Sequence, residues 1–274
     1  MNNIINTAVI DSFYKSLSIN NFFNINKINN KYYIDNNLCY ELENEGISIN
    51  WDKSNVKSFS NFNIDYKQII FNKLFNEIQH SLEKQFIKYL DEHSNKLNVQ
   101  FFRHNSLNSS LINLFYKNIR FSFKAEQTTQ DLISLLTSLY TKTYNDDSEL
   151  FIIISLEMVD FISHTIKEFE FTNKDNNKNE QLRKLGLIRI FNNLNEKEIF
   201  IDVFVCSQNI QLDHQTIYFG SKKLKELNPT LAYYCDNNSF YESITPFSGA
   251  SYCLNLYHKI IGNNYNVNKI ILSV

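Results

Sequence analysis

Glycine and proline are scarce in this chain, which has only 5 glycines and 2 prolines among its 274 residues. Globular proteins contain roughly 7% glycine and 5% proline on average. Such low contents exclude collagen-like and linker-rich architectures. They also argue against glycine-rich phosphate loops, and no P-loop, GxGxxG, GxSxG or HExxH motif occurs. We therefore expect no catalytic site and no enzymatic activity.

Long apolar runs and an excess of one charge sign are also missing. The longest apolar runs, such as Phe151–Ile154, are far too short to span a bilayer. Met1–Ile10 lacks the basic start and long apolar run of a signal peptide. The 27 basic and 29 acidic residues are intermixed, and no basic block suggests a grip on nucleic acid. We expect a soluble intracellular protein without a membrane partner.

Metal-binding patterns are absent as well. The four cysteines have no CxxC spacing and are expected to be buried free thiols in a reducing compartment; they are Cys39, Cys206, Cys235 and Cys253. The six histidines are isolated in sequence, so no compact ligand set forms. Asp146, Asp147 and Glu149 do not match a calcium loop and are expected to form a solvated turn. The sequence therefore predicts no metal and no cofactor.

A long amphipathic segment is the clearest feature that is present. Between Asp65 and His93, apolar residues recur at three- and four-residue spacing, and no glycine or proline interrupts them. A continuous helix of this length would measure roughly 40 Å. We expect a spine helix whose stripe packs across the C-terminal sheet. Its core residues are predicted to be Leu74, Ile78, Leu82 and Phe86.

Apolar and polar residues alternate in the segment before this helix, and this pattern predicts a β-hairpin. Residues 32–34 and 38–42 are expected to form one strand region and residues 46–51 a second, with the polar residues 43–45 between them. We expect this hairpin to project from the body and to contact a neighbouring subunit; an ordinary sheet edge is the alternative. The predicted contact residues are Glu41, Glu43, Ile47, Ile49 and Trp51.

The remaining patterns predict a mixed α+β protein. One strand is expected at 115–123, and residues 131–144, 150–155 and 156–169 read as helix, fully buried strand and helix. Strands dominate afterwards. They are predicted at residues 187–191, 198–206, 216–220, 231–235 and 251–257, and a last one at 269–274.

Several short segments occur in the order found in one known family. They are Glu149–Ser155, Leu185–Ile190, Ile199–Phe204, Tyr218–Lys222, Asn228–Tyr234 and Ser251–His258. In this order, the chain resembles major capsid proteins of tailed bacteriophages, in the contractile-tailed lineage whose fold is shared with herpesvirus capsids and encapsulins. Two departures stand out: Tyr144–Ser148 replaces the family's Arg-Gly-x-Gly, and Tyr257–His258 replaces its closing Arg-Tyr. These departures leave open a vertex subunit, a minor head protein, or a divergent homologue that no longer packages anything.

The resemblance implies a domain order. It comprises an N-terminal arm (1–30), an extended hairpin loop (31–60), and the spine helix with strands of a peripheral β-sheet domain (61–125). An axial α/β sub-domain (126–185) and a strand-rich return through both sub-domains (186–274) follow.

The resemblance also implies a function. The chain would be a major capsid subunit of a virion, assembled in the host cytoplasm into an icosahedral head shell. It would enclose double-stranded DNA without sequence-specific contact. Its partners would be copies of itself, in pentamers and hexamers, and portal, scaffold or decoration proteins. Other virion parts (vertex, tail sheath or tube), an encapsulin-like compartment shell, and an enzyme or binding module with an unrecognised site are the alternatives.

Overall fold

A computed structural model of the chain describes its secondary-structure elements and their immediate surroundings. The described residues are 22, 24–27, 32–35, 38–41, 43–51, 66–100, 112–116, 119–123, 132–140, 149–166, 169–172, 182–192, 196–206, 212–213, 215–221, 230–234, 240–245, 249–261 and 267–273. The chain divides into two units, each built from two separate stretches. Unit 1 comprises Met1–Phe86 and Asn228–Asn263, and unit 2 comprises Ile87–Leu227 and Asn264–Val274.

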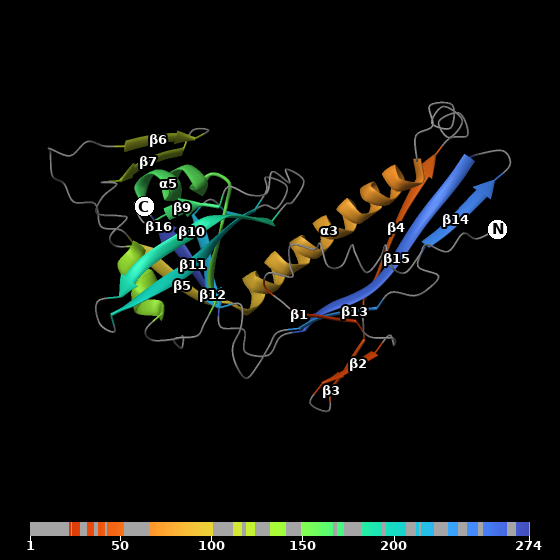
Figure 1. Ribbon diagram of the computed structural model, residues 1–274, viewed down its shortest axis with the longest axis horizontal. Helices are drawn as coiled ribbons and strands as arrows, with labels where there is room; N and C mark the ends of the chain where they lie inside the picture. Colours follow the sequence, from red (N-terminus) through yellow and green to blue (C-terminus); the bar gives the residue numbers. More distant parts are fainter. Residues whose placement is uncertain are drawn as a thin grey trace. The chain divides into compact units, whose positions relative to one another are not determined.

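Helices and strands alternate irregularly along the chain (Figure 1). Within the described ranges, the helices are α3 (Tyr66–His93), α5 (Met158–Thr165) and a helix over residues 132–140. The strands before α5 are β1 (Asn24–Lys27), β2 (Tyr32–Asp35), β3 (Leu38–Glu41), β4 (Glu43–Trp51), β5 (Asn95–Gln100), β6 (Ile112–Tyr116), β7 (Ile119–Phe123) and β8 (Leu150–Ile154). Those after α5 are β9 (Phe169–Phe171), β10 (Leu182–Asn192), β11 (Lys197–Cys206), β12 (Thr216–Ser221), β13 (Thr230–Tyr234), β14 (Phe240–Thr245), β15 (Gly249–Ile261) and β16 (Val267–Ser273).

Unit 2 is organised around a seven-stranded sheet in the order β5-β16-β12-β8-β11-β10-β9. β8 pairs in parallel with β11 and antiparallel with β12, and β16 pairs in parallel with β5. The sheet is therefore mixed. Together with the helices, it confirms the predicted α+β class.

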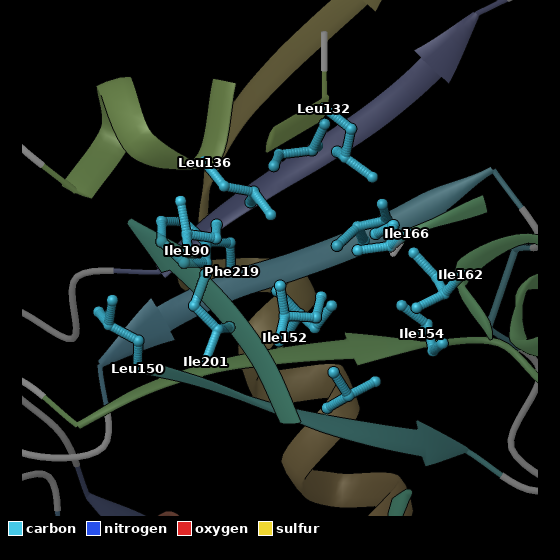
Figure 2. Packing of buried hydrophobic residues seen from close by; sticks show 14 of the residues in the cluster. Leu132, Leu136, Leu150, Ile152, Ile154, Ile162, Ile166, Ile190, Ile201 and Phe219 are labelled. Carbon is cyan, nitrogen blue, oxygen red and sulfur yellow. The ribbon is translucent and has the colours of Figure 1, made fainter. Parts of the chain in front are cut away.

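One face of this sheet carries the main core of unit 2. Alternate residues of the strands point to the same side, and those in the core of this first face are apolar, most of them aliphatic. Figure 2 shows Ile152, Ile190 and Phe219 from the sheet gathered with Leu136 and Ile162 from the helices. The helix at 132–140 and α5 thus cover the first face.

β8 is covered on both faces, as predicted for its unbroken apolar run. All five of its residues are buried. Ile152 belongs to the first-face core, and the intervening Phe151 and Ile153 point to the second face, where Phe204 and Tyr218 are also buried. A strand buried on both faces favours a continuous apolar sequence over alternation.

Gly220 in β12 marks a close approach on the second face. A Cβ atom at this position would lie 2.7 Å from Val267 Cγ2 and 3.0 Å from Phe151 Cζ. Both neighbours are buried and cannot move away freely. The missing side chain thus lets the Phe151 ring and Val267 pack against the backbone of β12.

Unit 1 is organised around the long strand β15. β14 pairs with Gly249–Leu254 and β13 with Tyr257–Ile261, so these two short strands share one edge of β15. β4 pairs with Ala250–His258 along the other edge. β1 extends the sheet by pairing in parallel with β13.

Four sequence predictions differ from these elements. Residues 43–45 belong to β4 instead of a turn, and β3 pairs with β2 instead of with β4. The single strand predicted at 115–123 is a pair, β6 and β7, on either side of Lys117 and Asn118. The helix predicted to reach Phe169 ends at Thr165, because Ile166 is extended and Phe169 begins β9, which pairs with β10. β1, β5 and β14 were not predicted.

Candidate functional site

The long helix α3 is the element that the sequence predicted most directly. It is continuous from Tyr66 to His93 and begins one residue after the predicted start. Six apolar residues, each four positions after the one before, are buried: Ile70, Leu74, Ile78, Leu82, Phe86 and Leu90. They include all four predicted core residues. Lys73, Glu77, Lys84 and Lys88 are exposed, so α3 has one buried and one solvated side.

A buried carboxylate interrupts the apolar stripe of α3. Glu83 is fully buried, and its Oε1 accepts a hydrogen bond of 3.0 Å from Gln79 Nε2 one turn earlier. Burying a charged group is unfavourable unless hydrogen bonds replace its hydration. The spacing of apolar residues gave no signal for this side chain, because Glu83 has the hydropathy of a surface residue.

Residues from the predicted N-terminal arm contact the same helix. Phe22 is buried, and its ring centroid lies 4.9 Å from that of Phe86. β1 follows two residues later and pairs with β13. Within the range 1–30, these residues belong to the packed part of unit 1.

The last turn of α3 is attached to the sheet of unit 2 through Asp91. Its Oδ1 accepts a hydrogen bond of 2.9 Å from the Tyr218 hydroxyl, and Lys269 Nζ donates to the same oxygen. Tyr218 and Lys269 are register partners on β12 and β16, and both point to the second face. The last turn of α3 therefore lies against this face. We call these three side chains the Asp91 clamp.

The Asp91 clamp shifts the protonation equilibria of its members. The hydrogen bond from Lys269 and that from Tyr218 hold the pKa of Asp91 below its ordinary value, against the opposing effect of partial burial. Burial and the neighbouring Asp91 carboxylate raise the pKa of Tyr218. The clamp thus favours a charged Asp91 and a neutral Tyr218. Sequence reasoning missed it because its residues are far apart in the chain.

The residues predicted to contact a neighbour lie on β3 and β4. Glu41 ends β3, and the other four lie on β4 at alternate positions. Glu43, Ile47, Ile49 and Trp51 occupy odd-numbered positions along β4. Their register partners on β15 are His258, Leu254, Tyr252 and Ala250. Their contact with another subunit stays a prediction.

The outer end of the β10–β11 pair carries exposed aromatic residues that sequence reasoning did not select. On the second face, Phe200 of β11 is 46% exposed and Phe191 of β10 is 57% exposed. Arg189 is the register partner of Phe200, and its guanidinium lies 5.5 Å from the centre of that ring. The alternation of residues along a strand identifies the face on which these side chains lie. It does not show which end of that face is left uncovered by other elements.

Chemical groups that could bind a metal do not gather in the described ranges. Among these residues, no group of three or more His, Cys, Asp or Glu side chains could hold an ion. Cys206 is buried and not part of a disulfide, as predicted. The side chains of the other three cysteines lie outside the described residues, as do Asp146 and Asp147. No helix among the described residues is long and apolar enough to cross a membrane.

The fold of this chain is similar to that of several solved structures. No family model and no curated protein matches the chain. Solved structures do match, over nearly the whole chain. A virus-like particle from Pyrococcus furiosus is 11% identical, with a TM-score of 0.53, over 96% of this chain and 96% of that chain.

Two further solved structures have similar scores. The satellite phage P4 procapsid is 9% identical, with a TM-score of 0.53, over 98% of this chain and 100% of that chain. The holo-SrpI encapsulin complex from Synechococcus elongatus is 9% identical, with a TM-score of 0.50, over 94% of this chain and 88% of that chain. The fold of this chain is thus similar to the folds of phage capsid and encapsulin structures, as its sequence resemblance predicted.

Proposed function

We propose that this chain is a structural subunit that assembles with copies of itself into a closed icosahedral shell, as a major capsid protein does. The observation that carries the proposal is the likeness in fold along almost the whole chain, 94% to 98% of it, to three shell or particle structures. Because the likeness covers both units, it concerns the complete architecture and not one common motif.

The long helix supports this proposal. We assign α3 the role of a spine, because it contributes residues 66–86 to unit 1 and residues 87–93 to unit 2. Its buried stripe and the Asp91 clamp are contacts that hold a structural element in place.

The finer division of the chain belongs to the same proposal. We assign unit 1 to the peripheral β-sheet domain and unit 2 to the axial α/β domain. Residues 31–60 supply the extended loop, whose contact residues are Glu41, Glu43, Ile47, Ile49 and Trp51. The shell encloses double-stranded DNA in a virion, and portal, scaffold or decoration proteins are further partners. With 27 basic and 29 acidic residues intermixed, the chain has no basic block for reading DNA, and this fits a shell that encloses DNA without sequence-specific contact.

Electron microscopy of the purified full chain tests the proposal. Closed shells or rings of subunits are the expected result. Helical tubes would instead identify a tail sheath or tube protein. A uniform monomer at every concentration would overturn the shell function and favour an enzyme or binding module.

The contents of the shells distinguish a capsid from an encapsulin-like compartment. The compartment is a second candidate because the fold is also similar to that of the encapsulin complex. Shells isolated from producing cells are treated with nuclease and then opened. Protected double-stranded DNA supports the capsid function. Protected protein without DNA supports a compartment shell.

Deleting the β2–β3 hairpin tests the part of the proposed loop that contains Glu41; the other four proposed contact residues lie on β4 and are kept. In the described part of the chain, β2 pairs only with β3, whereas β4 is paired along nine residues with β15. Removal of residues 32–41 should therefore leave the thermal unfolding of the subunit unchanged and prevent shell assembly. Removal of residues 43–51, the control, should unfold unit 1. Normal assembly after the first deletion would show that the hairpin does not contact a neighbour.

A further inference from the structure

Burial decreases steadily along one strand on the second face of the unit 2 sheet. Phe204, Asp202 and Phe200 alternate along β11 and share this face. Phe204 is buried, Asp202 is partly buried, and Phe200 is 46% exposed. The elements that cover the second face at its centre therefore do not reach its outer end.

The open end of this face combines aromatic rings with a cation. Phe191 lies two residues beyond Arg189 on β10, and Arg189 is opposite Phe200. Single exposed apolar residues are ordinary on protein surfaces. Two neighbouring phenylalanines with an arginine on one face are a different pattern, because aromatic residues and arginine are enriched where proteins bind each other. We call Arg189, Phe191, Phe200 and the adjoining Glu170 and Glu198 the outer patch.

The charges of the outer patch indicate what can cover it. Arg189 forms an ion pair of 3.8 Å with Glu170 of β9, and Glu198 is the register partner of Phe191. Positive and negative groups thus alternate over a short distance. With one positive and two negative side chains, the outer patch has no positive field that would attract nucleic acid or an anionic membrane. It complements a protein surface on which charges of both signs are interleaved in the same way.

We propose that the outer patch is a lateral contact with a second copy of this chain. A copy offers the same interleaved charges, so an arginine of one copy can face a glutamate of the other, and the phenylalanine rings of both are removed from water. This inference rests on the proposed shell function, because it names one of the surfaces through which subunits would meet.

Phe191 and Phe200 can be tested against a matched control on the other side of the same sheet. Phe171 is also 57% exposed, but its register partner is Gly186 and its ring packs edge-on against Phe169, which belongs to the first face. The experiment compares the full-length wild type, Phe191→Ser/Phe200→Ser and Phe171→Ser. Light scattering gives the protein concentration at which half of the subunits are assembled, and circular dichroism follows the folding of each subunit.

The double variant should raise the concentration for half-assembly at least about tenfold. A few buried side chains, often aromatic, supply most of the binding energy of a protein contact. Phe171→Ser should leave this concentration unchanged. Glu198→Lys is a second variant that keeps both rings; it should also weaken assembly, and by less at high salt, because screening reduces charge contacts.

Three results would overturn the inference. If the wild type assembles and the folded double variant assembles equally well, the outer patch is not a contact between copies, while the shell function stands. If Phe171→Ser weakens assembly as much as the double variant, the effect is not specific to this face. If the wild type never assembles, the shell function and this inference fail together.

Discussion

Gly220 lies where β12 passes closest to two buried side chains, and its replacement should be destabilising. In Gly220→Ala the new methyl group would lie 2.7 Å from Val267 Cγ2 and 3.0 Å from Phe151 Cζ. Forcing atoms into a filled core lowers the free energy of unfolding by about 1–3 kcal/mol. Urea unfolding of the dissociated subunit measures this change.

A second substitution separates crowding from other effects of the alanine. Val267→Ala removes the closest clashing methyl group, so Gly220→Ala should be less destabilising in a Val267→Ala background than in the wild type. The two substitutions should therefore not be additive. Additive losses would show that Val267 does not limit the space at Gly220.

Asp91 gives the subunit a stability that depends on pH. Because its pKa is lower in the folded protein than the ordinary value near 3.9, its interactions stabilise the fold above that pH. This stabilisation disappears as the pH falls and the carboxylate is protonated. The side chain is 48% exposed, so solvent limits the effect to about 1 kcal/mol or less. Urea unfolding at several pH values should show a higher free energy of unfolding for the wild type than for Asp91→Asn at pH 7. This difference should shrink below about pH 4.

Glu92→Gln is the control for Asp91→Asn. Glu92 faces Lys88 across 3.9 Å, and both side chains are mostly exposed. Removing this charge should change the free energy of unfolding by about 0.5 kcal/mol or less at any pH. An equal, pH-dependent loss for Glu92→Gln would mean that the Asp91 clamp has no special role.

Substitutions on the buried and exposed sides of the helix α3 should have different effects on stability. Leu82→Ala should lower the free energy of unfolding by about 2–5 kcal/mol, because Leu82 is one of the buried apolar residues of α3. Lys84→Ala, on the exposed side, should change it by about 0.5 kcal/mol or less. Thermal melts of both variants decide this. Equal, small shifts would contradict the burial of the stripe.

Elements defined by local spacing were predictable from the sequence. The stripe of α3 repeats every three or four residues without glycine or proline, and β8 is a short unbroken apolar run. β1 was missed because Asn24–Lys27 has the composition of a loop, and it becomes a strand through pairing with β13. Tertiary contact there overrides a weak local preference.

The candidate contacts between elements were less predictable for the same reason. Asp91 and Lys269 are 178 residues apart, and neither has a local pattern that indicates the other. Nothing in the sequence of β4 shows that it pairs with β15 and not with β3. The exposure of Phe200 depends on where the cover of the sheet ends, which only the folded chain determines.

At the scale of the whole molecule, assembly should add to the stability of each subunit. A partner that binds only the folded form stabilises it by mass action, by about 2.7 kcal/mol at a hundredfold excess over the dissociation constant. The melting temperature should therefore rise with protein concentration. Differential scanning calorimetry across a hundredfold dilution series measures this. A constant melting temperature for a sample that forms shells would contradict the prediction.

The position of β16 has a consequence for synthesis. This strand lies between β5 and β12 in the sheet of unit 2, yet it follows all six other strands in the sequence. While the chain is being translated, β5 cannot join the sheet, because the strand that connects it has not left the ribosome. Nascent chains therefore hold an incomplete unit 2, and association between them is delayed until β16 is free to insert.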